Sequence, residues 1–152
     1  MNKIETGFLF QMSLDVLRIT DLGDTPFGHR RIVEIAGGTF EGPKLRGRVL
    51  PGGGDWILIR RDGGVQMDVR VTLETDDEHL IYMSYRGIRH GPDDVIARLN
   101  AGADVDPSEY YFRIAPFFET GSETYGWLNR VISVATGYRK PSGPVYSVFE
   151  VL

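Results

Sequence analysis

Short runs rich in β-branched and aromatic residues recur along almost the whole chain, and Gly, Pro or Asp pairs separate them. Such runs, with turn residues between them, are typical of β-strands. The expected strands cover residues 5–19, 29–38, 44–50, 55–61, 65–75, 79–88, 108–117, 129–137 and 144–151. Asp62-Gly63-Gly64 and Thr75-Asp76-Asp77 are typical of hairpin turns, which make the neighbouring strands antiparallel. Because an open meander of nine strands would expose its edges, the pattern predicts an all-β, antiparallel barrel that is closed or nearly closed.

One helix interrupts the strands. Pro92-Asp93-Asp94 suits a first helical turn, apolar residues recur between Val95 and Leu99, and Asn100 to Gly102 ends the pattern. Thr120-Gly121-Ser122-Glu123 has the spacing of a capping box and predicts a second, short helical turn. The sequence contains no internal repeat or linker, so residues 1–152 are expected to form a single barrel domain.

Composition restricts the class of protein further. A chain of 152 residues buries about two-thirds of its unfolded surface and needs no covalent staples. Cysteine is absent, which excludes disulfides, thiolate nucleophiles and cysteine-ligated metals and favours a reducing compartment. The first 20 residues carry Lys3, Glu5 and Asp15 among apolar residues, unlike a signal peptide, and no run reaches membrane-spanning length. We therefore expect a cytoplasmic protein that does not bind membranes.

Several chemistries have no support in the sequence. The net charge is −4 and the arginines are scattered, so we expect no nucleic-acid partner. The chain lacks a phosphate loop, a Gly-x-Ser-x-Gly elbow and a dinucleotide fingerprint. His29, His79 and His90 lie far apart in the sequence, without the spacing of metal ligands. We therefore expect neither a cofactor nor a metal.

Residues 65–73 alternate between two kinds of side chain. Val65, Met67, Val69, Val71 and Leu73 form one face, and polar residues form the other. The apolar face is expected to be buried. The polar face either meets solvent or lines a polar lumen, because barrel residues alternate between inside and outside.

The segment Gly52-Gly53-Gly54-Asp55-Trp56 is the strongest site candidate. Three glycines at the start of a strand indicate either a barrel corner or a close approach of the backbone to a ligand. They would place Asp55 near a barrel mouth, with Trp56 beside it as a shield from water. A carboxylate that is partly desolvated in this way acquires a raised pKa, which suits a general acid or base.

Further candidates combine aromatic residues with arginines or acids. They are Tyr85, Arg86, Tyr111, Arg113, Glu119, Trp127 and Asn129. If these strand faces point inward, Arg86 and Arg113 would form an anion clamp, since a guanidinium offers a bidentate fork and stacks on rings. If they point outward, both arginines would pair with acids on the surface. The tryptophans suit either a core or a pocket wall, and Asn129 suits either a ligand carbonyl or a strand end.

The chain resembles a family of uncharacterised proteins, domain of unknown function 3237, across nearly its full length. The resemblance rests on six blocks: residues 38–43 (GTFEGP), 50–56 (LPGGGDW), 110–113 (YYFR), 117–121 (FFETG), 125–129 (YGWLN) and 145–151 (VYSVFEV). It implies a small antiparallel β-barrel, in agreement with the strand pattern. It implies no established activity and no catalytic residues.

Two functions follow as hypotheses. In the first, the barrel binds a small aromatic or carboxylated molecule and performs cofactor-free proton transfer, such as isomerisation, cyclisation or elimination. Asp55 and Glu119 would be its acids, Arg86 and Arg113 its clamp, and Tyr85, Tyr111, Trp56 and Trp127 its walls. In the alternative, a non-catalytic barrel assembles with itself or with a partner through an exposed aromatic face. A concave pocket with convergent polar groups favours the first, and a flat apolar patch favours the second.

Overall fold

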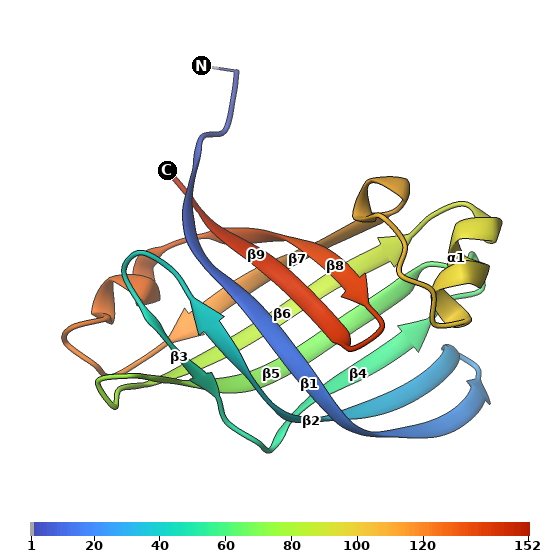
Figure 1. The fold of residues 1–152 in the computed structure, drawn as a ribbon, viewed down its shortest axis with the longest axis horizontal. Helices are drawn as coiled ribbons and strands as arrows, with labels where there is room; N and C mark the ends of the chain where they lie inside the picture. The colour runs from blue at the N-terminus through green and yellow to red at the C-terminus, as the bar shows by residue number, and fades with distance from the viewer. Residues whose placement is uncertain (1) are drawn as a thin grey trace.

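The structure of the chain is a computed structural model that describes residues 2–152, and its main feature is one antiparallel sheet curled into a barrel (Figure 1). The strands are β1 (Thr6–Thr25), β2 (Gly28–Glu41), β3 (Arg46–Val49), β4 (Gly53–Ile59), β5 (Val65–Thr75), β6 (Leu80–His90), β7 (Tyr111–Glu119), β8 (Ser133–Lys140) and β9 (Gly143–Val151). The helix α1 spans Asp93–Asn100, and 3₁₀ turns cover Pro107–Glu109 and Gly126–Arg130. The prediction of an antiparallel barrel with one short helix is confirmed.

Pairing between β1 and β2 closes the sheet. The strand order is β1-β9-β8-β7-β6-β5-β3-β2-β4, and β1 also pairs with β2 while β5 also pairs with β4. β3 and β4 follow one another in the same gap, each pairing with β2 on one side and β5 on the other. The barrel therefore has no open seam at this position, even though nine strands contribute to it.

The glycine triplet turns the chain between β3 and β4. Gly52 has a φ of +102°, a conformation that favours glycine. A Cβ atom on Gly53 would lie 2.7 Å from the carbonyl oxygen of Arg70 in β5. The triplet thus forms a corner at which two strands approach too closely for a side chain.

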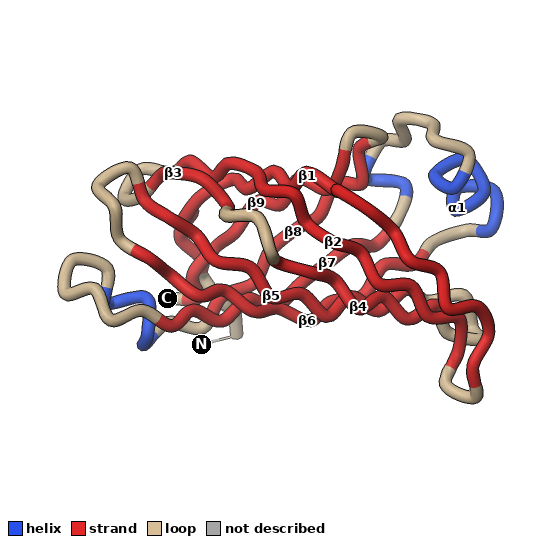
Figure 2. The backbone as a smooth tube through the Cα atoms, turned by 90° about the horizontal axis from the view of Figure 1, so that it is seen from below, coloured by secondary structure: helices blue, strands red, loops and turns tan. Residues whose placement is uncertain are grey.

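The two ends of the barrel differ. Large side chains fill the end that carries β3, where Phe10 packs edge-on against Phe40 and Phe118 with ring centroids 5.5 and 5.9 Å apart. At the opposite end lie α1 and the tip of the β1–β2 hairpin, which projects past the other strands (Figure 2). The apolar face of β5 is buried along its whole length, as its alternation predicts, while Asp68 and Arg70 on the other face are exposed.

Several element boundaries differ from the sequence prediction. β1 continues to Thr25 rather than ending near residue 19, because its pairing with β2 extends to Thr25 and Gly28. The helical turn expected at Thr120 is wrong. Thr120 accepts a hydrogen bond from the Ser122 backbone in a local turn, and the helical residues begin at Gly126. Within residues 2–152, no helix is long and apolar enough to cross a membrane.

Candidate functional site

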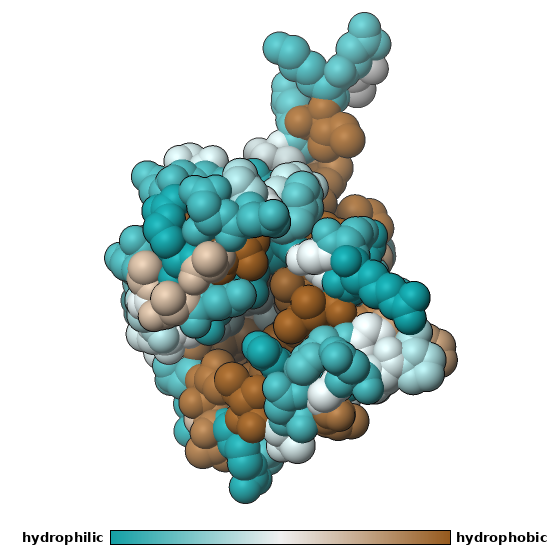
Figure 3. All heavy atoms as spheres, turned by 90° about the vertical axis from the view of Figure 1, so that its right-hand side faces the viewer, coloured by the Kyte–Doolittle hydropathy of each residue, from teal (hydrophilic) through white to brown (hydrophobic). Residues whose placement is uncertain are grey.

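A cavity of about 340 Å³ opens at the end of the barrel that carries α1. Figure 3 views the molecule from this end and shows a hollow with hydrophobic side chains inside a hydrophilic rim. Strands supply most of the wall, and Ile96, Leu99 and Asn100 of α1 complete it. The wall is mainly apolar, but four charged side chains reach it: Arg31, Asp55, Arg89 and Arg139.

Asp55 reaches the cavity because residues alternate along β4. The inward positions are Asp55, Ile57 and Ile59, which all line the cavity. Pairing between β4 and β5 is interrupted beyond Asp55 and Val69, and resumes at Leu58 and Gln66. In this gap the backbone N–H of Asp68 donates to Oδ1 of Asp55 at 3.0 Å. The carboxylate therefore replaces a strand carbonyl as the acceptor.

The environment of Asp55 raises the pKa of its carboxyl group above the ordinary value for aspartate. Burial raises its pKa to about 6, and the charge of Asp68 contributes in the same direction. The hydrogen bond from the Asp68 backbone and the charge of Arg89 act against this increase. No second donor to the carboxylate is found within residues 2–152, so one oxygen stays available to a molecule in the cavity. A carboxyl group that titrates near pH 6 can both accept and donate a proton at neutral pH.

Two tyrosines lie beside this carboxylate. Tyr85 is level with Asp55 in the sheet, because Val69 pairs with both residues from opposite sides. Its ring packs edge-on against Tyr146 of β9, with centroids 5.2 Å apart. Tyr85 is only 2% exposed, and its hydroxyl has the Tyr146 hydroxyl as a polar neighbour but makes no hydrogen bond within 3.5 Å in the described part of the chain. Burial raises the pKa of both phenols, so they are neutral and can donate hydrogen bonds.

Two arginines complete the polar part of the wall. Arg89 belongs to the same face of β6 as Tyr85, and its guanidinium lies over the ring of Phe112 at 5.7 Å. Its Nε atom is buried and lacks a hydrogen-bond partner among residues 2–152. Burial lowers the pKa of Arg89, and the nearby charge of Arg139 lowers it further. Arg139 comes from β8, where its guanidinium donates to the carbonyl oxygen of Lys140.

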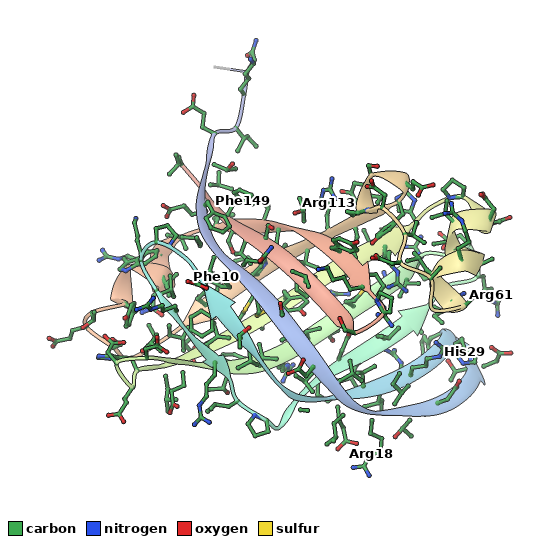
Figure 4. All side chains as sticks on the ribbon, in the orientation of Figure 1. Phe10, Arg18, His29, Arg61, Arg113 and Phe149 are labelled. Atoms are coloured by element: carbon green, nitrogen blue, oxygen red, sulfur yellow. The ribbon has the colours of Figure 1, made fainter. Side chains whose placement is uncertain are left out.

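The two arginines predicted as the clamp, Arg86 and Arg113, lie outside the barrel, as does the predicted wall residue Tyr111. Arg86, Tyr111 and Arg113 line a shallow groove over β6 to β9, and the figure places Arg113 near the top of the molecule (Figure 4). Arg113 donates to the carbonyl oxygen of Phe112 at 2.8 Å and stacks over Tyr111, which is 45% exposed. Of the two orientations that the sequence allows for these side chains, the structure has the outward one, because each directly follows a buried residue in the chain and points the opposite way.

The remaining candidates are dispersed. Trp56 is 41% exposed on the outer face, so it does not shield Asp55. Trp127 packs against the core with the ammonium group of Lys44 over its ring. Glu119 is exposed at the end of β7. Asn129 stabilises the loop between residues 120 and 129. Its side-chain oxygen accepts a hydrogen bond from the backbone N–H of Thr120, and its side-chain nitrogen donates to the carbonyl oxygen of the same residue. Of the predicted site residues, the cavity brings together Asp55 and Tyr85.

Comparison with known sequences shows the family of this chain. The model of the family described as "Protein of unknown function (DUF3237)" matches residues 4–151. The chain belongs to the DUF3237 family. A relative from Rhodopseudomonas palustris, named a UPF0311 protein, is 36% identical over 149 residues, which are 98% of this chain and 97% of the relative.

Solved structures share the barrel fold of this chain. A crystal structure of a conserved protein of unknown function from Rhodopseudomonas palustris superposes with a TM-score of 0.96 at 35% identity, covering both chains fully. A beta-barrel like protein from Acinetobacter baumannii gives 0.87 at 39% identity over 100% of this chain and 98% of the other. A protein from Penicillium herquei described as an enzyme gives 0.74 at 19% identity, over 98% and 95% of the two chains. At that identity the likeness concerns the fold alone.

Sequence interpretation does not predict several polar cavity residues of this DUF3237 barrel, among them Arg89, Arg139 and Tyr146. Strand alternation contains the signal for Arg89, because it stands four residues after the inward Tyr85. In β9, Tyr146 stands two residues before Val148, so alternation places both side chains on the same inward face, where both are buried. Arg139 lies beyond residue 137, where the sequence prediction ends this strand, so the predicted alternation does not reach it. Within residues 2–152, no group of three or more side chains suited to hold a metal ion is found.

Proposed function

We propose that this barrel binds a small, largely apolar organic molecule in its cavity and transfers a proton to or from it through Asp55. The observation that carries the proposal is the half-buried carboxyl group of Asp55 in a concave, mainly apolar site, with one oxygen available; desolvation there raises its pKa to about 6. Perturbed acids in clefts are over-represented at functional sites. A volume of about 340 Å³ suits a ligand of one or two rings, at the small end of ligand pockets.

The carboxyl group of Asp55 and the phenol of Tyr85 would have different roles in the reaction. As a base, Asp55 would remove a proton from a carbon next to a carbonyl group, leaving an enolate and a protonated Asp55. Tyr85, which is neutral and lacks a partner, would donate to the developing oxyanion. Return of the proton to another atom completes an isomerisation, a cyclisation or, with loss of a leaving group, an elimination. No step needs a redox partner.

Hydrogen exchange on a carbon acid tests the proposal without the natural substrate. The protein is incubated with 2-tetralone in D₂O, and deuterium in the ketone is measured by mass spectrometry. We expect exchange above the buffer rate, and about 100-fold less after Asp55→Asn, the usual contribution of a general base. Glu119→Gln removes an exposed acid outside the cavity and should leave the rate unchanged. Exchange at the buffer rate, or equal rates for the parent and Asp55→Asn, would contradict the proposal.

An exposed apolar segment favours a second candidate function, which is assembly with another copy of the chain. Pairing between β1 and β9 ends at Ser13 and Val145, so the later part of β1 has a free edge. Exposed apolar side chains follow this edge: Val16, Leu17, Ile19 and Leu22. Exposed edges are prone to pair with a further strand. Light scattering should then give a dimer that Leu17→Lys converts to a monomer, and a monomer at all concentrations would exclude this candidate.

A further inference from the structure

The cavity wall has more positive than negative charge. Of its four charged residues, Arg31 is compensated, since its Nε lies 3.5 Å from an oxygen of Asp21. Arg89 and Arg139 have no carboxylate within ion-pair distance in the described part of the chain. Asp55 is the one acid on the wall. Two uncompensated guanidinium groups therefore face one carboxyl group in a mainly apolar cavity.

Such an arrangement is costly for the folded protein. Arg89 and Arg139 are half-buried, and the Nε atom of Arg89 is fully buried without a partner among residues 2–152. A cation that is partly desolvated and unpaired loses hydration, and two cations near one another repel. The lowered pKa of Arg89, caused by burial and by the charge of Arg139, is consistent with this cost. The Tyr85 hydroxyl also lines this cavity and makes no hydrogen bond within 3.5 Å, although the Tyr146 hydroxyl is near it. Buried polar atoms without partners require an explanation, and the two here, Tyr85 Oη and Arg89 Nε, can both donate a hydrogen bond.

We propose that Arg89, Arg139 and Tyr85 form an anion subsite that binds a negatively charged oxygen of the ligand, carried by a carboxylate or by a stable enolate. This inference rests on the proposed function and specifies its substrate class as an aromatic or alicyclic organic anion. Guanidinium groups match such oxygens through two parallel N–H donors. The apolar wall of Ile57, Ile59 and Met67 would hold the hydrocarbon part.

The subsite also explains why a mainly apolar cavity has guanidinium groups without carboxylate partners on its wall. An anion held at Arg89 would lie near Asp55, because the charges of these two residues already influence each other. The ligand would then satisfy the donors, while its reacting carbon stays within reach of the free carboxyl oxygen. A neutral ligand would leave the guanidinium groups unpaired and lose this contribution.

Binding of matched probes tests the subsite. The probes are 2-naphthoate, its neutral amide 2-naphthamide, and 2-phenylindane-1,3-dione, which is an enolate at neutral pH. We expect calorimetry to show that at least one anion binds about 10- to 100-fold more tightly than the amide, the scale of charge-assisted hydrogen bonds. The tighter of the two anions identifies whether the natural ligand presents a carboxylate or an enolate.

Variants separate the subsite from the proposed function. Arg89→Met should remove the preference for the anion without lowering the melting temperature, because it replaces a half-buried guanidinium that has no carboxylate partner and whose Nε atom is buried and unpaired. Arg89→Lys keeps the charge and should retain part of the preference. Arg113→Met makes the same change outside the barrel and should alter nothing.

The outcomes are distinguishable. If the amide binds as tightly as both anions, or if the preference survives Arg89→Met, the anion subsite does not exist while the cavity remains a binding site. If no probe of this size binds to the parent protein, both the subsite and the proposed function fail. If Arg113→Met abolishes the preference, the ligand occupies the outer groove and the inference is overturned.

Discussion

Replacing Asp55 with asparagine should stabilise the protein at neutral and alkaline pH, although asparagine is nearly isosteric with aspartate. Folding raises the pKa of Asp55 from 3.8 to about 6. The unfolded chain therefore loses this proton at lower pH than the folded chain does. As the pH rises from about 4 through 6, the folded state loses stability relative to the unfolded state.

The size of this effect follows from the shift. A difference of about two pKa units lowers the free energy of unfolding of the parent by about 3 kcal/mol once Asp55 is fully ionised. The full loss is present at pH 8, and about 0.5 kcal/mol of it is present at pH 4. The asparagine side chain cannot ionise, and its carbonyl oxygen can still accept from the Asp68 backbone. We thus expect Asp55→Asn to unfold about 6 to 12 °C above the parent at pH 8, since about 2 to 4 °C corresponds to each kcal/mol in a domain of this size.

Thermal unfolding followed by tryptophan fluorescence at several pH values between 4 and 8 measures this difference in unfolding temperature. Asp15→Asn removes a carboxylate from the exposed part of β1 and controls for the change in net charge. The reasoning is refuted if Asp55→Asn is no more stable than the parent at pH 8. It is also refuted if the gain is the same at pH 4 and pH 8, because ionisation then has no part in it.

Three further predictions concern the fold. Gly53→Ala would place a Cβ atom 2.7 Å from a carbonyl oxygen of β5 and should cost about 1 to 3 kcal/mol in urea unfolding, whereas Gly121→Ala meets no atom within 4 Å and should be neutral. Phe10→Ala empties the centre of the filled end and should cost about 3 to 5 kcal/mol by the same assay, and a loss below 1 kcal/mol would show that the core rearranges. His29 has a pKa raised by its contact with Asp24, so NMR titration should find it above 6.5 and find it lowered by Asp24→Asn; an unchanged value would disprove the contact in solution.

The sequence predicts most of the strands because their signals are local. β5 has the predicted bounds, residues 65–75, since its alternation is strict and turns flank it on both sides. The end of β1 is different. Residues 20–25 carry polar and glycine residues that do not indicate a strand, and they are extended because β2 pairs with them as far as Thr25. Pairing between distant residues is a tertiary effect that a local pattern does not contain.

The site was predicted only in part for a related reason. Asp55 could be found because the glycines that position it are adjacent in the sequence. The aromatic neighbours of Arg86 and Arg113 indicate a pocket, but successive residues of a strand point to opposite faces. Each arginine therefore lies outside when its aromatic neighbour, Tyr85 or Phe112, lies inside. The inward arginine, Arg89, becomes evident only when the inward face of β6 is fixed by closure of the barrel.

A crystal structure of the protein grown with 2-naphthoate tests the central claim most directly, because it locates the ligand relative to Asp55 and Arg89. We expect the naphthalene ring in the cavity at the α1 end, the carboxylate against the Arg89 guanidinium, and one oxygen of Asp55 facing the ring. A naphthoate molecule bound only in the outer groove at Arg86 and Arg113, with none in the cavity at saturating concentration, would contradict the account.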